Sequence, residues 1–176
     1  MSYFNTIKLD ATASSNDWLK NKYMEGDYSD GDVVWVRNQT QGRGQRDKLW
    51  QTEPMKNLTF SLFKLFPKLT LENAFTINCA VTLAVTKALS EIANIEFTLK
   101  WPNDIYVGQK KLGGILLEML GDPAGHCSVV VGVGINVSMP VEAGEAIDQD
   151  WTDINSQLNK PVSRNTLVAA LISHLL

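Results

Sequence analysis

Two lysines, a polar turn and a glycine pair stand between two apolar runs in the middle of the chain. The letters KWPND fill residues 100–104, and KLGGILLE follows at residues 111–118. Lysine side chains attract anions, while the oxygen atoms of Asn103 and Asp104 suit a ligand or a metal ion. Two structural alternatives stay open: an Asx turn at Asn103-Asp104, and a solvent-exposed Lys111 beside a hairpin with a bulge at its glycines. The segment indicates a site that handles an anion.

A second polar segment, residues 38–57, has no hydrophobic periodicity. Loops longer than about 12–15 residues are uncommon in a single domain and are often functional. Glycines allow the backbone to approach a ligand closely, and successive N–H groups can bind an anion. The residues of interest are Gln39, Gly42, Arg43, Gly44, Arg46, Lys48 and Trp50. Taken alone, the segment also fits a solvated basic loop, and it matches neither the P-loop nor the GxGxxG pattern.

The third segment is a strand with bare backbone on one face. In residues 131–137, with the letters VGVGINV, Gly132 and Gly134 alternate with valine and isoleucine. Successive side chains of a strand point to opposite faces, so both glycines share a face on which a ring or chain can lie. A glycine-rich core strand, with Asn136 satisfying backbone groups, explains the same letters without a ligand.

Composition limits the range of functions. The chain has 176 residues, 44% of them hydrophobic, and a net charge of −3, which fits one globular domain without a global positive field for nucleic acid or membranes. Cys79 and Cys127 have neither zinc nor disulfide spacing, which favours a reducing, cytoplasmic setting. No signal peptide is evident, and no apolar run comes near the roughly 20 residues of a membrane span.

Periodicity and caps predict the elements that position these segments. Apolar residues recur every three or four positions over 73–94, which predicts an amphipathic helix. Caps at Ser14 and Gly26 predict a second helix, and Ser163 begins a last one. Strands are predicted at 32–37, 58–63, 97–100, 104–107, 114–120 and 128–137, with turns or loops at 108–109, 121–125 and 138–150. The pattern predicts an α+β domain with helices on a mixed, mostly antiparallel sheet.

Together and in this order, the three segments resemble the catalytic domain of the biotin protein ligases, also called biotin–[acetyl-CoA-carboxylase] ligases. That family carries a GRGRxGR-type loop, then KWPND, a KL[AG]GIL[VL]E run and a GxGIN strand. Here these motifs stand at residues 42–48, 100–104, 111–118 and 132–136, and the resemblance covers about residues 5–176. It implies the class II synthetase-like fold of biotin and lipoate ligases.

The resemblance implies an ATP-dependent ligase. Such enzymes join the carboxylate of biotin to the α-phosphate of ATP, release diphosphate, and pass the biotinyl group to a lysine of a biotin carboxyl carrier protein domain. Biotin, ATP and Mg²⁺ are the implied ligands, with no tightly bound prosthetic group, and a homodimer is compatible with the family. No DNA partner is expected, because the sequence contains no helix-turn-helix before this domain.

Single residues acquire roles from the same resemblance. Lys111 and Arg43 are the implied catalytic cations, whereas Lys100 is expected to support the turn at residues 101–102. Nucleotide contacts are implied for Arg46, Trp50, Asn103 and Asn136, and a Mg²⁺ contact for Asp104. The implied biotin site comprises Ser14, Ser15, Asn16, Gln39, Gly42, Arg43, Gly44, Lys111, Gly114 and Gly134.

Departures from the family pattern lead to further expectations. Gln45, Asp47 and Lys48 replace an arginine, a glycine and an arginine of the loop, so weaker retention of the adenylate is expected. Residues 1–176 are expected to form the catalytic domain alone, without the helix-turn-helix and the small C-terminal β-barrel of many relatives. Two alternatives remain: a lipoate or octanoate ligase with the same fold, and a non-catalytic module that binds biotin or biotinyl-AMP.

Overall fold

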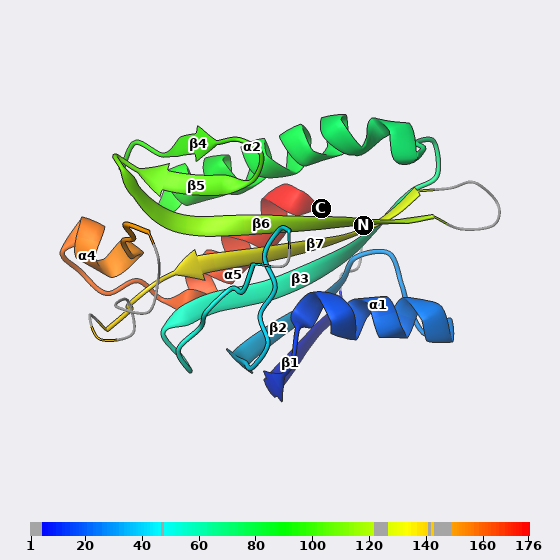
Figure 1. Cartoon of the computed structure of the whole chain (residues 1–176), viewed down its shortest axis with the longest axis horizontal. Coiled ribbons are helices and arrows are strands. Elements are labelled where there is room, and N and C mark those ends of the chain that lie inside the picture. The colour runs from blue at the N-terminus through cyan, green and yellow to red at the C-terminus, as the bar shows by residue number, and fades with distance from the viewer. Residues whose placement is uncertain (1–4, 47, 122–126, 141, 143–148) are drawn as a thin grey trace.

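A seven-stranded sheet organises the chain (Figure 1). The computed structural model describes residues 5–46, 48–121, 127–140, 142 and 149–176. In spatial order the strands are β1 (Asn5–Thr12), β2 (Asp32–Gln39), β3 (Asn57–Phe66), β7 (Cys127–Asn136), β6 (Lys110–Gly121), β5 (Asp104–Val107) and β4 (Thr98–Lys100). Strands β1 and β2 pair in parallel, and the other neighbouring strands pair antiparallel. The predicted α+β class with a mixed, mostly antiparallel sheet is confirmed.

Helices cover both faces of this sheet. Helix α1 (Ser15–Glu25) packs on one face, in front of the sheet in Figure 1, where Leu19 joins Val34 and Phe63 in a small apolar cluster. On the other face α2 (Ala74–Ile92) and α5 (Arg164–Leu175) contribute to the main core. A 3-10 turn (Leu71–Asn73) leads into α2, and a short helix α4 (Ile154–Leu158) precedes α5.

Alternation along the strands makes the two faces of the sheet different. On β7, Val131, Val133 and Ile135 belong to the core that α2 and α5 share, so Gly132 and Gly134 lie on the α1 face. The side of the sheet that α1 partly covers therefore carries little side-chain volume on this strand. This asymmetry leaves room for a hollow beside α1.

Helix α1 begins and ends as predicted. The Oγ of Ser14 accepts a hydrogen bond from the backbone N–H of Asp17 (3.4 Å), and Gly26 ends the helix in the left-handed region with φ 76°. Ser15 and Asn16 consequently lie in the first turn of the helix, where both are buried against the sheet. The cap thus fixes two predicted site residues in place.

Among the described elements, the 3-10 turn (Leu71–Asn73), strand β1 and helix α4 were not predicted. Strand β1 is half-exposed along its length and lies at the edge of the sheet, so its Ile7 and Leu9 give only a weak alternating pattern. Helix α4 has five residues, too few for helical periodicity to be visible. Strand β6 also begins earlier than predicted, at Lys110, directly after the expected two-residue turn. Most of the predicted segments 121–125 and 138–150, and Asp47, lie outside the described residues.

One helical segment corrects the sequence-based expectation about membrane spans. By length and composition, the 22 residues Leu71–Ile92 are apolar enough to cross a membrane, with a mean hydropathy of 1.2. One face of this segment, including Ile77, Val85 and Leu89, is buried in the main core. A core helix of a globular domain has the same length and composition, so this finding is weak evidence for a membrane segment.

We predict that Gly113 is required by the close approach of β6 to β7. A Cβ atom added at Gly113 would lie 2.6 Å from the backbone oxygen of Gly134 on the neighbouring strand. We therefore expect Gly113→Ala to lower the free energy of unfolding by about 1–3 kcal/mol in urea denaturation. At Gly121, which serves as the control, the nearest atom to an added Cβ is Leu71 Cδ1 at 3.7 Å. Gly121→Ala should cost less than about 0.5 kcal/mol, and equal losses in both variants would contradict the close approach.

Candidate functional site

A hollow of about 550 Å³ opens on the α1 face of the sheet. This volume is in the range of small-molecule sites, about 300–1,000 Å³. The start of α1, the loop around residues 43–51, the start of β5 and the glycine faces of β6 and β7 enclose it. Every predicted site residue lines the hollow except Gly42, which lies behind Trp50. The structure therefore brings together segments that are far apart in the sequence.

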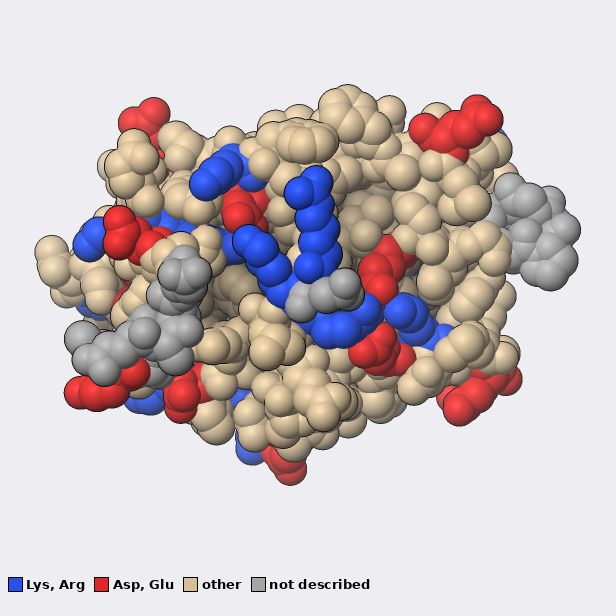
Figure 2. Space-filling model, viewed as in Figure 1, with Lys and Arg blue, Asp and Glu red and all other residues tan. Residues whose placement is uncertain are grey.

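Cationic side chains surround this hollow. Figure 2 shows Lys and Arg side chains gathered near the middle of the face that carries α1. Among the described lining residues, the charged ones are four cations and one carboxylate: Arg43, Arg46, Lys48, Lys111 and Asp104. A chain with a net charge of −3 thus has a local positive field that favours an anionic ligand.

Lys111 is held by both its side chain and its backbone. Its Nζ lies 2.8 Å from Oδ1 of Asp104, and the two side chains are 15% and 24% exposed. The backbone N–H of Lys111 donates to the carbonyl of Asp150, and its carbonyl accepts from the N–H of Thr152, both at 2.9 Å. The alternative of a lysine kept in water is wrong. The predicted bulge occurs one residue before the glycine pair, because Leu112 is skipped in the pairing of β5 with β6.

The turn before β5 is held to β6 and does not form the alternative Asx turn through Asn103. The Nδ2 of Asn103 donates to the carbonyl of Ile115 (2.7 Å), and the N–H of Ile115 donates to the carbonyl of Asn103 (2.9 Å). Lys100 lies outside the hollow, with its Nζ 5.3 Å from the centre of the Tyr106 ring. The two lysines of the motif therefore have different surroundings, and the contact of Lys100 is with Tyr106.

Trp50 rests on the bare backbone of the sheet. A Cβ atom added at Gly134 would lie 2.5 Å from Cε2 of the indole, and one added at Gly114 would lie 3.7 Å from Cζ3. The loop is hairpin-like at this point, because Arg43 bridges to Leu49 and the N–H of Trp50 donates to the carbonyl of Gly42 (2.8 Å). The indole Nε1–H is buried and has no acceptor among the described residues. The face on which a ligand was expected to lie thus carries an aromatic ring.

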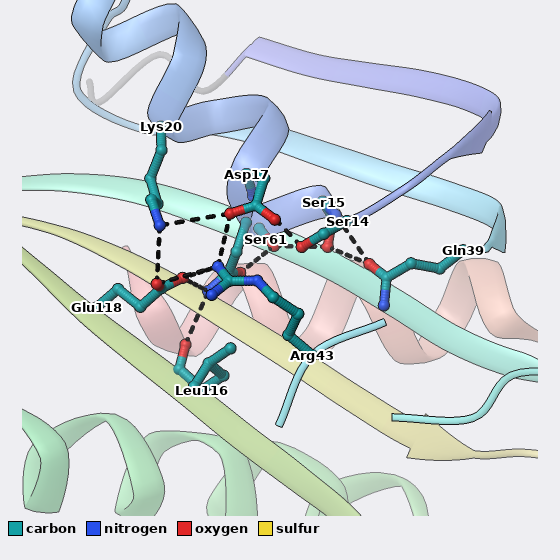
Figure 3. A network of polar contacts seen from close by, with 10 residues as sticks. Ser14, Ser15, Asp17, Lys20, Gln39, Arg43, Ser61, Leu116 and Glu118 are labelled. Carbon is teal, nitrogen blue, oxygen red and sulfur yellow. Dashed lines mark hydrogen bonds and ion pairs between the residues drawn. The ribbon is translucent and has the colours of Figure 1, made fainter. Parts of the chain in front are cut away.

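Buried polar side chains form one end of the hollow (Figure 3). The N–H and Oγ of Ser15 both donate to Oε1 of Gln39, at 2.8 and 2.9 Å. Ser61 on β3 forms hydrogen bonds with Oγ of Ser15 (2.7 Å) and with Oδ1 of Asn16. Gly132 makes room for the side chain of Asn16. A Cβ atom added at Gly132 would lie 2.3 Å from Oδ1 of Asn16. These groups present donors and acceptors that suit a neutral polar ring.

An ion-pair cluster borders this polar end (Figure 3). Nη2 of Arg43 donates to Oδ1 of Asp17 (2.6 Å) and to Oε2 of Glu118 (2.8 Å), and Oε1 of Glu118 accepts from Lys20 (2.9 Å). Burial by itself would raise the pKa of Glu118, but hydrogen bonds from Asn16, Lys20 and Arg43 outweigh it and lower that pKa. Burial would likewise lower the pKa of Arg43, and the two carboxylates reverse the effect and raise it. The carboxylate of Glu118 therefore stays ionised under ordinary conditions.

Asn136 uses its side chain within the protein. Its Oδ1 accepts from Nδ2 of Asn57 (2.9 Å), and its Nδ2 donates to the carbonyl of Thr152 (3.1 Å). Because the N–H of Thr152 donates to the carbonyl of Lys111, Asn136 helps to fix the segment that backs this lysine. Trp151 from the same segment also lines the hollow.

Several lining or bordering residues were not predicted from the sequence: Asp17, Lys20, Ser61, Glu118 and Trp151. Glu118 is the only charged residue in the apolar run 115–120, and this pattern could have identified it. The roles of Asp17 and Lys20 depend on the packing of α1 on the sheet. No periodicity indicates that contact.

The comparisons place this architecture among known proteins. The Biotin/lipoate A/B protein ligase family profile matches residues 9–136. The chain is 29% identical over 162 residues to the Bifunctional ligase/repressor BirA of Escherichia coli, covering 92% of this chain and 49% of that protein. It is also 29% identical over 167 residues to the Biotin--[acetyl-CoA-carboxylase] ligase of Mycobacterium tuberculosis, covering 93% and 60%. The chain thus spans about half the length of BirA.

A solved structure shows the same fold. The biotin protein ligase from Aquifex aeolicus, in complex with biotin and ATP, superposes with a TM-score of 0.80 at 31% identity. The match covers 98% of this chain and 69% of that chain. An apo structure of the Aquifex protein gives a TM-score of 0.73 at 28% identity. The fold and the arrangement of its strands are therefore shared with these ligases.

We predict that Gly134→Ala displaces the ring of Trp50, because its added Cβ would lie 2.5 Å from the indole. Gly114→Ala is the matched control, since its nearest atoms to an added Cβ lie at 3.6 Å or beyond. Tryptophan fluorescence should shift in the first variant and stay near wild type in the second. The shift should vanish when both are measured in a Trp50→Phe background, and a shift that persists there would contradict this assignment.

A second prediction concerns acid stability. The lowered pKa of Glu118 means that its ionised form stabilises the folded state above the ordinary glutamate pKa of about 4.3. This stability is lost as the pH falls through the lowered pKa of the folded state. We expect wild type to exceed Glu118→Gln in free energy of unfolding at pH 7, with a difference that shrinks below about pH 4.3. Urea denaturation across this range measures it, and a difference that grows in acid would contradict the ionised carboxylate.

Proposed function

We propose that this chain activates biotin with ATP. It belongs to the Biotin/lipoate A/B protein ligase family and, within that family, to the biotin protein ligases. The biotinyl group then passes to a lysine of a biotin carboxyl carrier protein domain. The observation that carries the proposal is Lys111, a mostly buried cation held by Asp104 in a hollow of about 550 Å³. Three further lining cations and a neutral polar end surround it.

The first step forms the adenylate. A carboxylate oxygen of biotin attacks the α-phosphorus of ATP, and the bond from that phosphorus to diphosphate breaks. Lys111 and Arg43 are the proposed cations for the negative charge that builds up on the phosphate oxygens. Groups of this kind, fixed before the reaction, contribute about 10²–10³-fold to the rate. The ion pair of Lys111 with Asp104 supports this role, because it holds the ammonium in place. One carboxylate does not neutralise the four cations that line the hollow.

Biotin is proposed to bind with its ureido ring at the polar end. Ser14, Ser15, Asn16 and Gln39 offer the donors and acceptors that such a ring needs. The chain of biotin would run along Gly114 and, once the indole of Trp50 is displaced, along Gly134. Gly44 would let the loop backbone approach the ligand, whereas Gly42 would act through its contacts with Trp50 and Gln39.

The nucleotide is proposed to occupy the other side of the hollow. Arg46 would face the phosphates, and the indole of Trp50 would stack on the adenine. The side chains of Asn103 and Asn136 form hydrogen bonds within the protein. They would therefore contribute to the nucleotide site by holding its lining residues in place.

Mg²⁺ would enter with ATP. No group of three metal-binding side chains occurs among the described residues, which fits an ion held mainly by phosphates. Asp104 is the proposed protein carboxylate for it, and the ion would neutralise charge on the departing diphosphate.

The second step transfers biotin to the carrier. The carrier's lysine amine attacks the carbonyl of the mixed anhydride, AMP leaves, and an amide bond forms. The loop that carries Arg43 and Trp50 would keep water from the anhydride until then. A cytoplasmic setting and a homodimer through a sheet edge complete the proposal. The free cysteines Cys79 and Cys127 agree with the former, and the outer strands β1 and β4 offer edges for the latter.

The test measures diphosphate release and carrier biotinylation together. Lys111→Ala should lower the rate of diphosphate release about 10²–10³-fold, because one cation at the reacting phosphate is lost. Lys110→Ala is the matched control, since that neighbouring lysine is exposed and does not line the hollow.

Three outcomes would contradict the proposal. Diphosphate release with lipoate in place of biotin would favour a lipoate ligase. Binding of biotin without diphosphate release by wild type would favour a non-catalytic module. A loss of activity shared by Lys110→Ala would contradict the specific role of Lys111.

A further inference from the structure

We propose that Glu118 is a positioning residue, which fixes the loop arginine Arg43 against the polar end of the hollow. The inference rests on the proposed function for what Arg43 does. It extends that function to a residue on β6 whose carboxylate borders the hollow. Glu118 does not itself line the hollow, so it acts through the groups that it holds.

The carboxylate of Glu118 accepts hydrogen bonds from three residues on two segments, helix α1 and the loop. Its Oε2 accepts from Nδ2 of Asn16 (2.8 Å) and from Nη2 of Arg43 (2.8 Å), and its Oε1 accepts from Nζ of Lys20 (2.9 Å). These donors belong to the first turn of α1, the loop and the second turn of α1. Figure 3 shows the side chains converging on the carboxylate between α1 and β6. One side chain thus ties the helix, the loop and the sheet together.

The geometry at Arg43 has a consequence for binding. The contacts with Asp17 and Glu118 all use Nη2 of the guanidinium. Its Nε–H is buried and has no acceptor among the described residues, although Arg43 lines the hollow. The carboxylates of Asp17 and Glu118 therefore fix the guanidinium by one nitrogen before a ligand binds. Without this hold, the long side chain would sample many rotamers.

A hydrogen-bond path joins this arginine to the polar end. Glu118 binds Asn16, Asn16 binds Ser61, Ser61 binds Ser15, and Ser15 binds Gln39. Three of these residues, Ser15, Asn16 and Gln39, line the hollow. A ligand that orders the polar end thereby also orders the partner of Arg43.

Trypsin cleavage tests the hold on the loop in the ligand-free chain. The loop offers cleavage sites after Arg43, Arg46 and Lys48. Glu118→Gln keeps the shape of the side chain and removes its charge, so we expect cleavage in the loop to rise about five-fold or more. Glu118→Asp retains the charge and should return the rate part of the way to wild type. Unchanged cleavage in Glu118→Gln overturns the proposal.

Matched variants separate this effect from general loosening. Asp30→Asn breaks an ion pair of similar length, with Lys64 at 2.8 Å, at a place remote from the loop. It should leave the loop cleavage unchanged, and a rise equal to that of Glu118→Gln would overturn the proposal. If Glu118→Gln does not fold, Arg43→Gln breaks the same contact from the loop side. Cleavage after Arg46 and Lys48 then gives the answer, and an unchanged rate overturns the proposal.

Steady-state kinetics gives a second test of Glu118, which does not depend on the result of trypsin cleavage. With biotin saturating, Glu118→Gln should lower kcat/KM for ATP about ten-fold or more, and Glu118→Asp should restore much of it. If wild type releases no diphosphate, the proposed function fails while the cleavage result still decides the role of Glu118. If wild type is active and Glu118→Gln matches it in kcat/KM and in cleavage, the positioning role alone fails.

Discussion

The close pairing of β6 with β7 is the constraint on which the rest of the structure depends. Gly113 faces the core side, where an added Cβ would lie 2.6 Å from the backbone of β7, and Gly132 and Gly134 face the α1 side. Gly132 leaves room for Asn16, and Gly134 leaves room for Trp50. A Cβ atom added at Gly132 would lie 2.3 Å from Asn16, and one added at Gly134 would lie 2.5 Å from Trp50. The glycines thus let the helix and the loop settle directly on the sheet. The hollow is what remains between these two contacts.

Charge follows from this arrangement. An overall acidic chain gathers cations over one sheet face, and carboxylates from neighbouring elements hold two of them. Asp104 holds Lys111, while Asp17 and Glu118 hold Arg43. Ion pairs at partly exposed positions contribute little to stability, about 0–1 kcal/mol each. Their value here is orientation, because a long side chain that is fixed before binding does not have to be ordered by the ligand.

Sequence patterns identified most of the residues that line the hollow, but few of the residues that hold those side chains in place. The resemblance of the motifs to the ligase family identified Lys111, Arg43 and Gly134, which line the hollow. The alternation over 131–137 predicted the bare face, since a strand has a strict period of two. The hold of Glu118 on Arg43 spans 75 positions and depends on the packing of α1, which no local pattern encodes. Strand β1 was missed for a similar reason, because an exposed edge strand needs few apolar residues.

The position of Trp50 shows why the loop and the polar end act as one unit. Its ring lies on Gly134, so a ligand lying on that glycine would have to displace the indole. The loop itself contacts the polar end, because the backbone N–H of Trp50 donates to the carbonyl of Gly42, and a Cβ atom added at Gly42 would lie 2.7 Å from Nε2 of Gln39. Gln39 in turn binds Ser15 at the polar end. The loop that carries Trp50 therefore contacts both ends of the hydrogen-bond path, Gln39 through Gly42 and Glu118 through Arg43.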